Sequence, residues 1–266
     1  MPDVAAEIPP QEEEKEAMPT MGFLDHLEEL RKRIIYSVIA VAGGFFVCWG
    51  YADNIYGVMQ VPIMTALRNH HLPEKLVYLN PTEPFNLYLK IAALAGLFLT
   101  CPFVLYQVWL FIAPGLYRNE KRYVGPFLFS TVALFVAGGY FGYRFVYPAA
   151  LDFLIGYGSR FQPMITIAEY TQLFLTIILG MGVVFEIPIL VFFLSLMGIV
   201  SAGFMWKNFR YAILVIFIIA AIITPTTDIL NMCIFAAPMV ALYAISIGIA
   251  WRVHPKQRAA RREKKA

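Results

Sequence analysis

Residues 102–122, PFVLYQVWLFIAPGLYRNEKR, are the stretch that decides the fold class of this chain. They close a long apolar run, concentrate aromatic side chains over a few turns, and break at Pro114-Gly115. The stretch then ends in charge, with Glu120 set among three cations. An aromatic collar followed by a basic turn is typical of the boundary between a membrane and the cytosol. The stretch therefore predicts a membrane protein.

The composition of the whole chain supports the same class. Hydrophobic residues make up 59% of the 266 residues and charged residues only 15%, whereas soluble domains are about half apolar and about a quarter charged. The charges cluster at the ends of the apolar runs, which predicts a polytopic membrane protein. Cys48, Cys101 and Cys233 lie in apolar runs without paired spacing. They are interpreted as small buried hydrophobes, and no metal or cofactor is expected.

Six apolar spans follow one another along the chain, and the predicted fold is all-α. The predicted spans are Ile34–Tyr51, Phe85–Ala113, Val124–Tyr147, Tyr170–Met197, Tyr211–Ile223 and Ile229–Trp251. An even number of spans places both termini on one side, and most basic residues fall on that side, so the positive-inside rule predicts cytoplasmic termini. Residues 1–20, rich in Pro and Glu, are predicted to be a disordered tail. Residues 21–252 then form the membrane domain, and residues 253–266 a basic tail.

The segments between and before the spans carry three further expectations. Residues 22–33 alternate apolar and charged side chains at helical spacing, which predicts an amphipathic helix lying along the membrane surface. The long outer segments Ala52–Pro84 and Pro148–Glu169 are expected to fold as ordered caps. The span Tyr211–Ile223 gives only about 20 Å of helix against a hydrocarbon core of about 30 Å. Local membrane thinning is expected there, with the outer connection Thr224–Asp228 kept wet.

Glu186 is the ionisable residue deepest within a predicted span. A carboxylate at that depth is costly, so it is expected to face a polar cavity or a partner. Pro188 frees a backbone carbonyl nearby and adds polarity at the same level. Two readings stay open: a polar patch that engages another helix or a passing chain, or a hydrogen bond to a neighbouring span. Asn231 could supply a further polar contact from the sixth span.

Motifs for catalysis are missing from the sequence. There is no P-loop glycine pattern, no H-E-x-x-H, no G-x-S-x-G and no Cys/His metal spacing. The four histidines do not share a cluster. An enzyme is therefore not expected, and nucleic acid is not an expected partner. A carrier, a channel or a receptor for other polypeptides remains.

Four stretches together resemble the TatC family, whose members are the signal-peptide receptor and core subunit of the twin-arginine protein translocase. The first two are FLDHLEELRKR at residues 23–33 and LYQVWLFIAPGLY at residues 105–117, the latter followed by Glu120. The others are VVFEIP at residues 183–188 and TPTTD at residues 224–228. The similarity covers residues 22–251 in the family's order and spacing. One position departs from it: Met232 stands where the family often has Gln.

The resemblance implies a concave, glove-like bundle of six helices, with the fifth and sixth short, in the bacterial cytoplasmic membrane. It implies signal-peptide binding by Glu29, Phe111 and Glu120. It also implies an intramembrane polar group of Glu186 with Asp228, to which Asn231 is a candidate addition in place of the family's Gln. Expected partners are single-span subunits of the TatA and TatB type and further copies of the chain, with export of folded proteins driven by the proton-motive force.

The two adjacent arginines of a twin-arginine signal peptide require two acidic sites on one surface, because each guanidinium pairs best with a carboxylate. Glu29 and Glu120 supply them, Phe111 can take the apolar residues that follow, and Arg31 and Lys121 are expected to compete for the carboxylates. Two other functions stay open. An ion-coupled small-molecule transporter would use Glu186 but leaves the Glu120 turn without a role, and an assembly scaffold would explain the lack of catalytic motifs.

Overall fold

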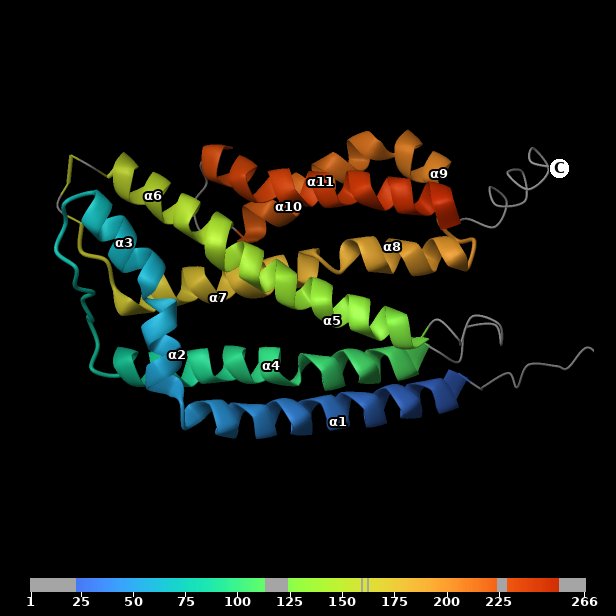
Figure 1. The fold of residues 1–266 in the computed structure, drawn as a ribbon, viewed down its shortest axis with the longest axis horizontal. Coiled ribbons are helices and arrows are strands. Elements are labelled where there is room, and N and C mark those ends of the chain that lie inside the picture. Colours follow the sequence, from blue (N-terminus) through green and yellow to red (C-terminus); the bar gives the residue numbers. More distant parts are fainter. Residues whose placement is uncertain (1–22, 113–123, 159, 162, 224–228, 254–266) are drawn as a thin grey trace, which may run out of the picture.

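The described part of the chain is a helical bundle (Figure 1). The computed structural model describes residues 23–112, 124–158, 160–161, 163–223 and 229–253. Its helices in chain order are α1 (Phe23–Trp49), α2 (Ala52–Met59), α3 (Val61–Asn69), α4 (Glu83–Ile112), α5 (Val124–Phe141), the π-helix η3 (Gly142–Val146), α6 (Tyr147–Tyr157), α7 (Ile167–Val184), α8 (Ile187–Leu196), α9 (Ala202–Lys207), α10 (Phe209–Ile223) and α11 (Ile229–Val253). The described residues contain no sheet, only one isolated bridge between Val77 and Thr166. The all-α fold is confirmed.

The membrane spans follow the prediction with two differences of length. Five helical stretches are long and apolar enough to cross a membrane, namely His26–Trp49, Glu83–Phe111, Gly125–Tyr157, Ile167–Leu196 and Met232–Arg252. The predicted fifth span is α10, whose 15 residues give only about 22 Å against about 30 Å of hydrocarbon. α11 has 25 residues and can cross fully. The third span is longer than predicted, because η3 joins α5 to α6 in one rod.

The two ends of the bundle differ in structure. The start of α1 and the end of α11 lie together at one end, which we call the terminal end (Figure 1). α2, α3 and α6 lie at the other, which we call the cap end. The long segments expected to be ordered caps are thus largely helical.

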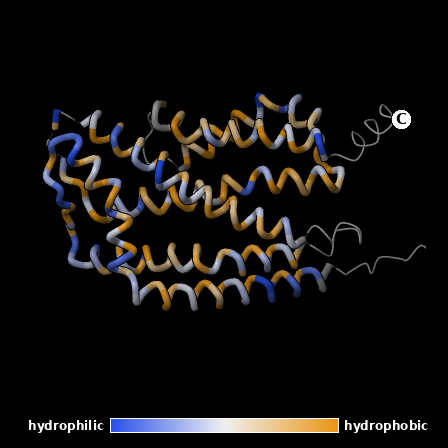
Figure 2. The backbone as a smooth tube through the Cα atoms, in the orientation of Figure 1, coloured by the Kyte–Doolittle hydropathy of each residue, from blue (hydrophilic) through white to orange (hydrophobic). Residues whose placement is uncertain are grey.

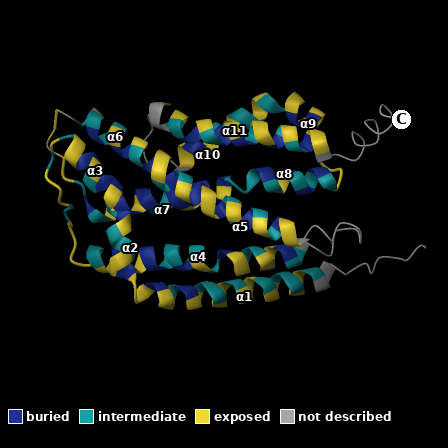
Figure 3. Ribbon diagram, in the orientation of Figure 1, coloured by how far each residue is buried: buried dark blue, intermediate teal, exposed yellow. Residues whose placement is uncertain are grey.

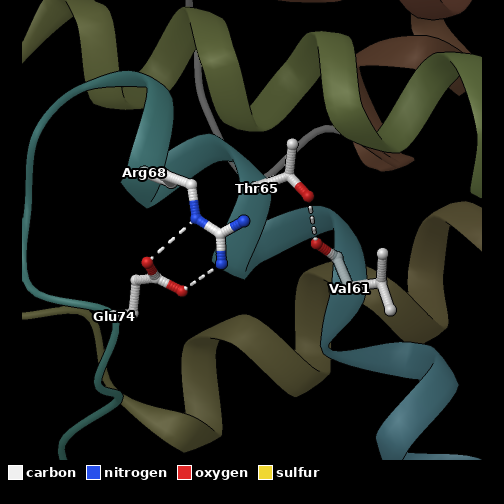
Figure 4. A network of polar contacts seen from close by, with 4 residues as sticks. All are labelled: Val61, Thr65, Arg68 and Glu74. Atoms are coloured by element: carbon white, nitrogen blue, oxygen red, sulfur yellow. Dashed lines mark hydrogen bonds and ion pairs between the residues drawn. The ribbon is translucent and has the colours of Figure 1, made fainter.

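A bidentate ion pair stabilises the turn that follows α3 in the cap. Glu74 accepts hydrogen bonds from Nε of Arg68 at 3.0 Å and from Nη2 at 2.8 Å (Figure 4). One turn earlier, the hydroxyl of Thr65 donates to the carbonyl of Val61 at 2.8 Å (Figure 4). Because both partners of the ion pair are exposed, it orders the turn more than it stabilises the fold.

α1 is one straight helix of 27 residues, and it lies beside α4 along its length (Figure 1). The prediction that residues 22–33 lie along the membrane surface is therefore wrong, because residues 23–33 extend the first span without a break. The contacts that their side chains make with the end of α4 keep the helix in line.

Two glycines bring α1 and α4 into backbone contact. A Cβ at Gly44 would lie 2.7 Å from the carbonyl oxygen of Gly96, and a Cβ at Gly96 would lie 2.6 Å from the backbone nitrogen of Phe45. Small residues at such a crossing let helices pack closely where hydrocarbon offers no hydrophobic driving force. The contact between α1 and α4 is the most extensive helix contact in the described structure.

The buried residues form a large cluster toward the cap end and a smaller aromatic cluster toward the terminal end. The large cluster surrounds Tyr147 and Ile177. The small one consists of Trp109, Phe127 and Phe193, with the Trp109 ring centroid 4.3 and 4.4 Å from the other two. Trp109 is only 4% exposed. It fills the space between α4, α5 and α8.

The outward faces of the spans are apolar and exposed (Figures 2 and 3). Phe46 on α1 and Phe129 on α5 are 73% and 77% exposed. Hydrophilic residues gather at the start of α1 and in the cap connections (Figure 2). A bundle that exposes large apolar side chains along whole helices is suited to lipid as its solvent.

Candidate functional site

Two stripes of functional side chains face one another at the terminal end. On α1, His26, Glu29 and Arg33 lie at spacings of three and four residues, which places them on one helix face. On α4, Gln107 and Phe111 lie four residues apart. The contacts that follow show that the two stripes meet across the α1–α4 interface.

The aromatic half of the site is a ring stack. The imidazole of His26 stacks on the phenyl ring of Phe111, with centroids 4.4 Å apart and planes at 19°. Since His26 lies one turn before Glu29, the stack places Phe111 beside the predicted acidic residue. The structure therefore brings together two of the three residues predicted to bind a signal peptide.

The charged half of the site is a chain of two interactions. Oε1 of Glu29 lies 3.1 Å from Nη2 of Arg33, and Nη1 of Arg33 donates to Oε1 of Gln107 at 3.1 Å. Gln107 is only 5% exposed, and the side chains of Arg33 and Glu29 are 26% and 18% exposed. Arg33 therefore links α1 to α4 and fixes the direction of the Glu29 carboxylate.

The charged chain is incomplete at its acidic end. Oε2 of Glu29 is buried and has no hydrogen-bond partner, and the same is true of Nε of Arg33. An ionised carboxylate has about four acceptor positions, and leaving a charged group without partners costs more than about 1–3 kcal/mol. The free oxygen is thus an acceptor without a donor among the described residues.

Arg33 and Gln107 are site residues that the sequence analysis missed. The expected competitors were Arg31, which is exposed, and Lys121, which lies outside the described residues. The spacing of four residues between Glu29 and Arg33 is a helical ion-pair signal that could have identified Arg33. Gln107 is a single amide in an apolar run, and this polar residue was a second signal that could have identified the site.

Glu120, the third predicted binding residue, lies outside the described residues, between the end of α4 and the start of α5. Both of those helix ends are at the terminal end of the bundle (Figure 1). The placement of Glu120 and its contacts stay a prediction.

Glu186 lies at a break between α7 and α8. Its backbone carbonyl accepts hydrogen bonds from Ile189 and Leu190, and Pro188 lies in the first turn of α8. The side chain is half-buried, and its Oε1 has no hydrogen-bond partner. The open reading of a hydrogen bond from a neighbouring span to this oxygen is not supported, whereas a polar contact with another molecule stays a prediction.

The other members of the predicted polar group are not placed. Asp228 and the side chain of Asn231 lie outside what the structure describes. Met232, where the family often has Gln, packs against the large apolar cluster. The sixth span is therefore apolar at this position.

An apolar hollow of about 390 Å³ lies between α5, α8 and α11. Its wall begins at Pro126 and Phe127 in the first turn of α5 and includes Phe192 of α8. Arg252, near the end of α11, lines its rim. The hollow thus opens a few residues after the connection that contains Glu120.

The fold and the site define a polytopic helical membrane protein that offers an incompletely paired carboxylate and an aromatic stack at one end. Among the described residues, no group of three or more His, Cys, Asp or Glu side chains could hold a metal ion.

Comparison with known proteins identifies the family. The family model described as Sec-independent protein translocase protein (TatC) matches residues 25–238, and the chain belongs to this family. It is 70% identical to the TatC protein of Koribacter versatilis over 94% of this chain and 92% of that protein. It is 40% identical to the TatC protein of Carboxydothermus hydrogenoformans over 89% and 96% of the two chains. A crystal structure of the twin-arginine translocase receptor TatC superposes with a TM-score of 0.76 at 34% identity, covering 86% of this chain and 99% of that one.

Proposed function

We propose that this chain is the receptor subunit of a twin-arginine translocase and that Glu29, Phe111 and Glu120 bind twin-arginine signal peptides. The observation that carries the proposal is the unpartnered Oε2 of Glu29, buried beside the ring stack of His26 on Phe111. A carboxylate in that state favours a ligand that brings its own donors. The relatives named as translocase proteins support the same function.

Guanidinium chemistry explains why the ligand carries arginines. A guanidinium donates two parallel hydrogen bonds to a carboxylate, whereas an ammonium acts as a point charge. One arginine of the signal peptide pairs with Glu29, and the adjacent arginine pairs with Glu120. Arg33 holds Oε1 of Glu29 at 3.1 Å, so the incoming guanidinium finds Oε2 as the unpaired acceptor and competes with Arg33 for Oε1.

The apolar part of a signal peptide also needs a surface. Secretory signals contain an apolar stretch of about 7–15 residues after their charged start. In this proposal Phe111 contacts the first apolar residues, and the hollow that begins at Pro126 accepts the following ones. Its walls are apolar side chains from three helices, which suits a segment without charges.

The terminal end faces the cytoplasm in this proposal, and the membrane is the bacterial cytoplasmic membrane. Described basic residues at the terminal end are Arg31, Lys32, Arg33, Lys207, Arg210 and Arg252, while those toward the cap are Arg68, Lys75, Lys90, Arg144 and Arg160. The basic tail at residues 253–266 contains six more, so the excess agrees with the positive-inside rule.

Export itself requires partners in this proposal. Single-span subunits of the TatA and TatB type dock along α11 and the shorter α10, with Glu186, Asp228 and Asn231 as polar contacts. Several copies of the chain act in one complex, and the proton-motive force drives export of the folded cargo. The half-buried Glu186 carboxylate, with Oε1 unpartnered, supports a polar contact with another molecule inside the membrane.

Binding of a twin-arginine signal peptide to the purified, full-length chain tests the receptor function. A peptide with both arginines changed to lysine is the matched control, because it keeps the charge and loses the planar fork. Strong retention of the arginine peptide and weak retention of the lysine peptide is the expected result. Equal retention of both peptides, or of neither, would count against the receptor function and favour a transporter.

A further inference from the structure

A second candidate site lies at the cap end, away from the signal-peptide site. An open pocket of about 590 Å³ lies between α3, η3 and α6, and this volume falls in the range of small-ligand sites. Its wall contains the charged residues Arg144 and Asp152 and the polar residues Thr65 and Asn69. The remaining lining is mainly small or apolar.

The position of Arg144 along its helix places the cavity at the membrane surface. The third span begins at Gly125, and Arg144 lies about 28 Å further along the rod at 1.5 Å per residue. The hydrocarbon core is about 30 Å thick. With Gly125 taken as the start of the hydrocarbon core, Arg144 lies near its cap-side limit, and α6 continues beyond it.

The guanidinium of Arg144 has no ion pair or hydrogen bond within the described chain. It lies over the ring of the adjacent Phe145, 5.9 Å from the centroid. Arg144 belongs to the π-helix η3, and π-helical turns occur frequently at functional sites. An arginine at the headgroup level without an anionic partner is suited to a phosphate.

Asp152 places a negative charge on the same cavity. Its Oδ1 lies 2.8 Å from Nε2 of His70, and its side chain is 65% exposed. His70 is the C-cap residue of α3, so this contact ties the α3 wall to the α6 wall. Oδ2 of Asp152 has no hydrogen-bond partner among the described residues and can accept a hydrogen bond from a cation.

We propose that this cavity binds the headgroup of a phospholipid that carries both a phosphate and an ammonium group, from the leaflet at the cap end. The phosphate pairs with Arg144, and the ammonium pairs with Asp152. Thr65 and Asn69 add hydroxyl and amide groups to the polar wall. A headgroup with a phosphate and a glycerol would satisfy only Arg144, so the opposite charges in one cavity favour the zwitterion.

Native mass spectrometry of the full chain with phosphatidylethanolamine or phosphatidylglycerol tests the proposal. The wild type is expected to retain phosphatidylethanolamine about tenfold more strongly, the effect of one charge-assisted hydrogen bond. Arg144→Gln should lower retention of both lipids about tenfold, while Arg144→Lys keeps part of it. Asp152→Asn should remove the preference alone, because the amide oxygen still accepts from His70.

Arg160→Gln is the matched control, since it removes an arginine of the cap end that does not line the cavity. It should leave retention and preference unchanged. Equal retention of the two lipids by the wild type, or an equal loss in the Arg160 and Arg144 variants, would overturn the proposal. A photo-crosslinking residue at Thr65 should gain the mass of a phospholipid in membranes, and a protein adduct there would overturn the lipid assignment.

Discussion

Replacing Glu29 by Gln tests the proposed receptor site most directly, because Glu28 next to it is a matched control. Glu29 is 18% exposed in its side chain, pairs with Arg33 and leaves one oxygen buried and free. Glu28 is 66% exposed and pairs with Lys32 at 3.3 Å across the same helical spacing. Each substitution removes one negative charge from the same turn of α1 and keeps the side-chain shape.

The expected loss of peptide affinity follows from the state of the two carboxylates. A hydrogen bond to a charged group contributes about 1.5–3 kcal/mol, and each 1.4 kcal/mol changes a dissociation constant about tenfold. Glu29→Gln should therefore weaken binding of a twin-arginine peptide by about 10- to 100-fold. Glu28→Gln loses only an exposed ion pair, which contributes about 0–1 kcal/mol, and does not contact the peptide. Its affinity should stay within about twofold of the wild type.

The measurement is a titration of a labelled signal peptide against each purified variant, with thermal unfolding recorded in parallel. Glu29→Gln also removes the charged partner of Arg33, so a fall in Tm of a few degrees is expected. If the Glu29→Gln variant is folded and still binds the peptide poorly, the loss of affinity arises at the binding site and not from unfolding. If Glu29→Gln binds as the wild type does, or if Glu28→Gln loses as much affinity, the assignment of Glu29 is refuted.

Three further predictions concern other parts of the structure. Gly96→Ala places a Cβ 2.6 Å from a backbone nitrogen of α1 and should cost about 1–3 kcal/mol in thermal unfolding, whereas Gly43→Ala, which meets nothing within 4 Å, should not destabilise. Arg68 holds the pKa of Glu74 below its ordinary 4.5, mainly through their hydrogen bonds. The ion pair therefore stabilises the turn after α3 fully above pH 4.5, and this stabilisation is lost as the pH falls through the lowered pKa. A carboxyl NMR titration should show a low pKa for Glu74 that rises in Arg68→Gln. Glu186→Ala should lower export several-fold at normal protein levels, measured by precursor processing in cells, while Glu186→Gln should be nearly silent; normal export by Glu186→Ala would remove this residue from the mechanism.

The sequence predicts the spans and the short α10 correctly because both depend on local properties. The length of an apolar run against the thickness of hydrocarbon decides whether a helix can cross, and α10 is too short by that measure whatever surrounds it. That Glu29 and Phe111 lie on the two helices that meet at the terminal end was predictable only through the family resemblance, because they are 82 residues apart in the chain.

The errors arise where tertiary packing overrides a local pattern. Residues 22–33 have the charge pattern of a surface helix, yet contacts with α4 hold them in line with the first span. Trp109 is likewise enclosed by two aromatic rings that α5 and α8 supply. Neither partner can be assigned from the residues nearby in sequence.

The unpaired oxygen of Glu29 shows most clearly why the site needed the structure. From the sequence, Glu29 is one of several carboxylates in a run of charges, and all of them have cations nearby. In the bundle, the two terminal nitrogens of Arg33 donate to Gln107 and to Oε1 of Glu29. Oε2 of Glu29 is then buried without a donor. That geometry depends on the close approach of α1 and α4, which glycine permits near the other end of α1. Widening the helix pair there should therefore loosen the site as well as the fold.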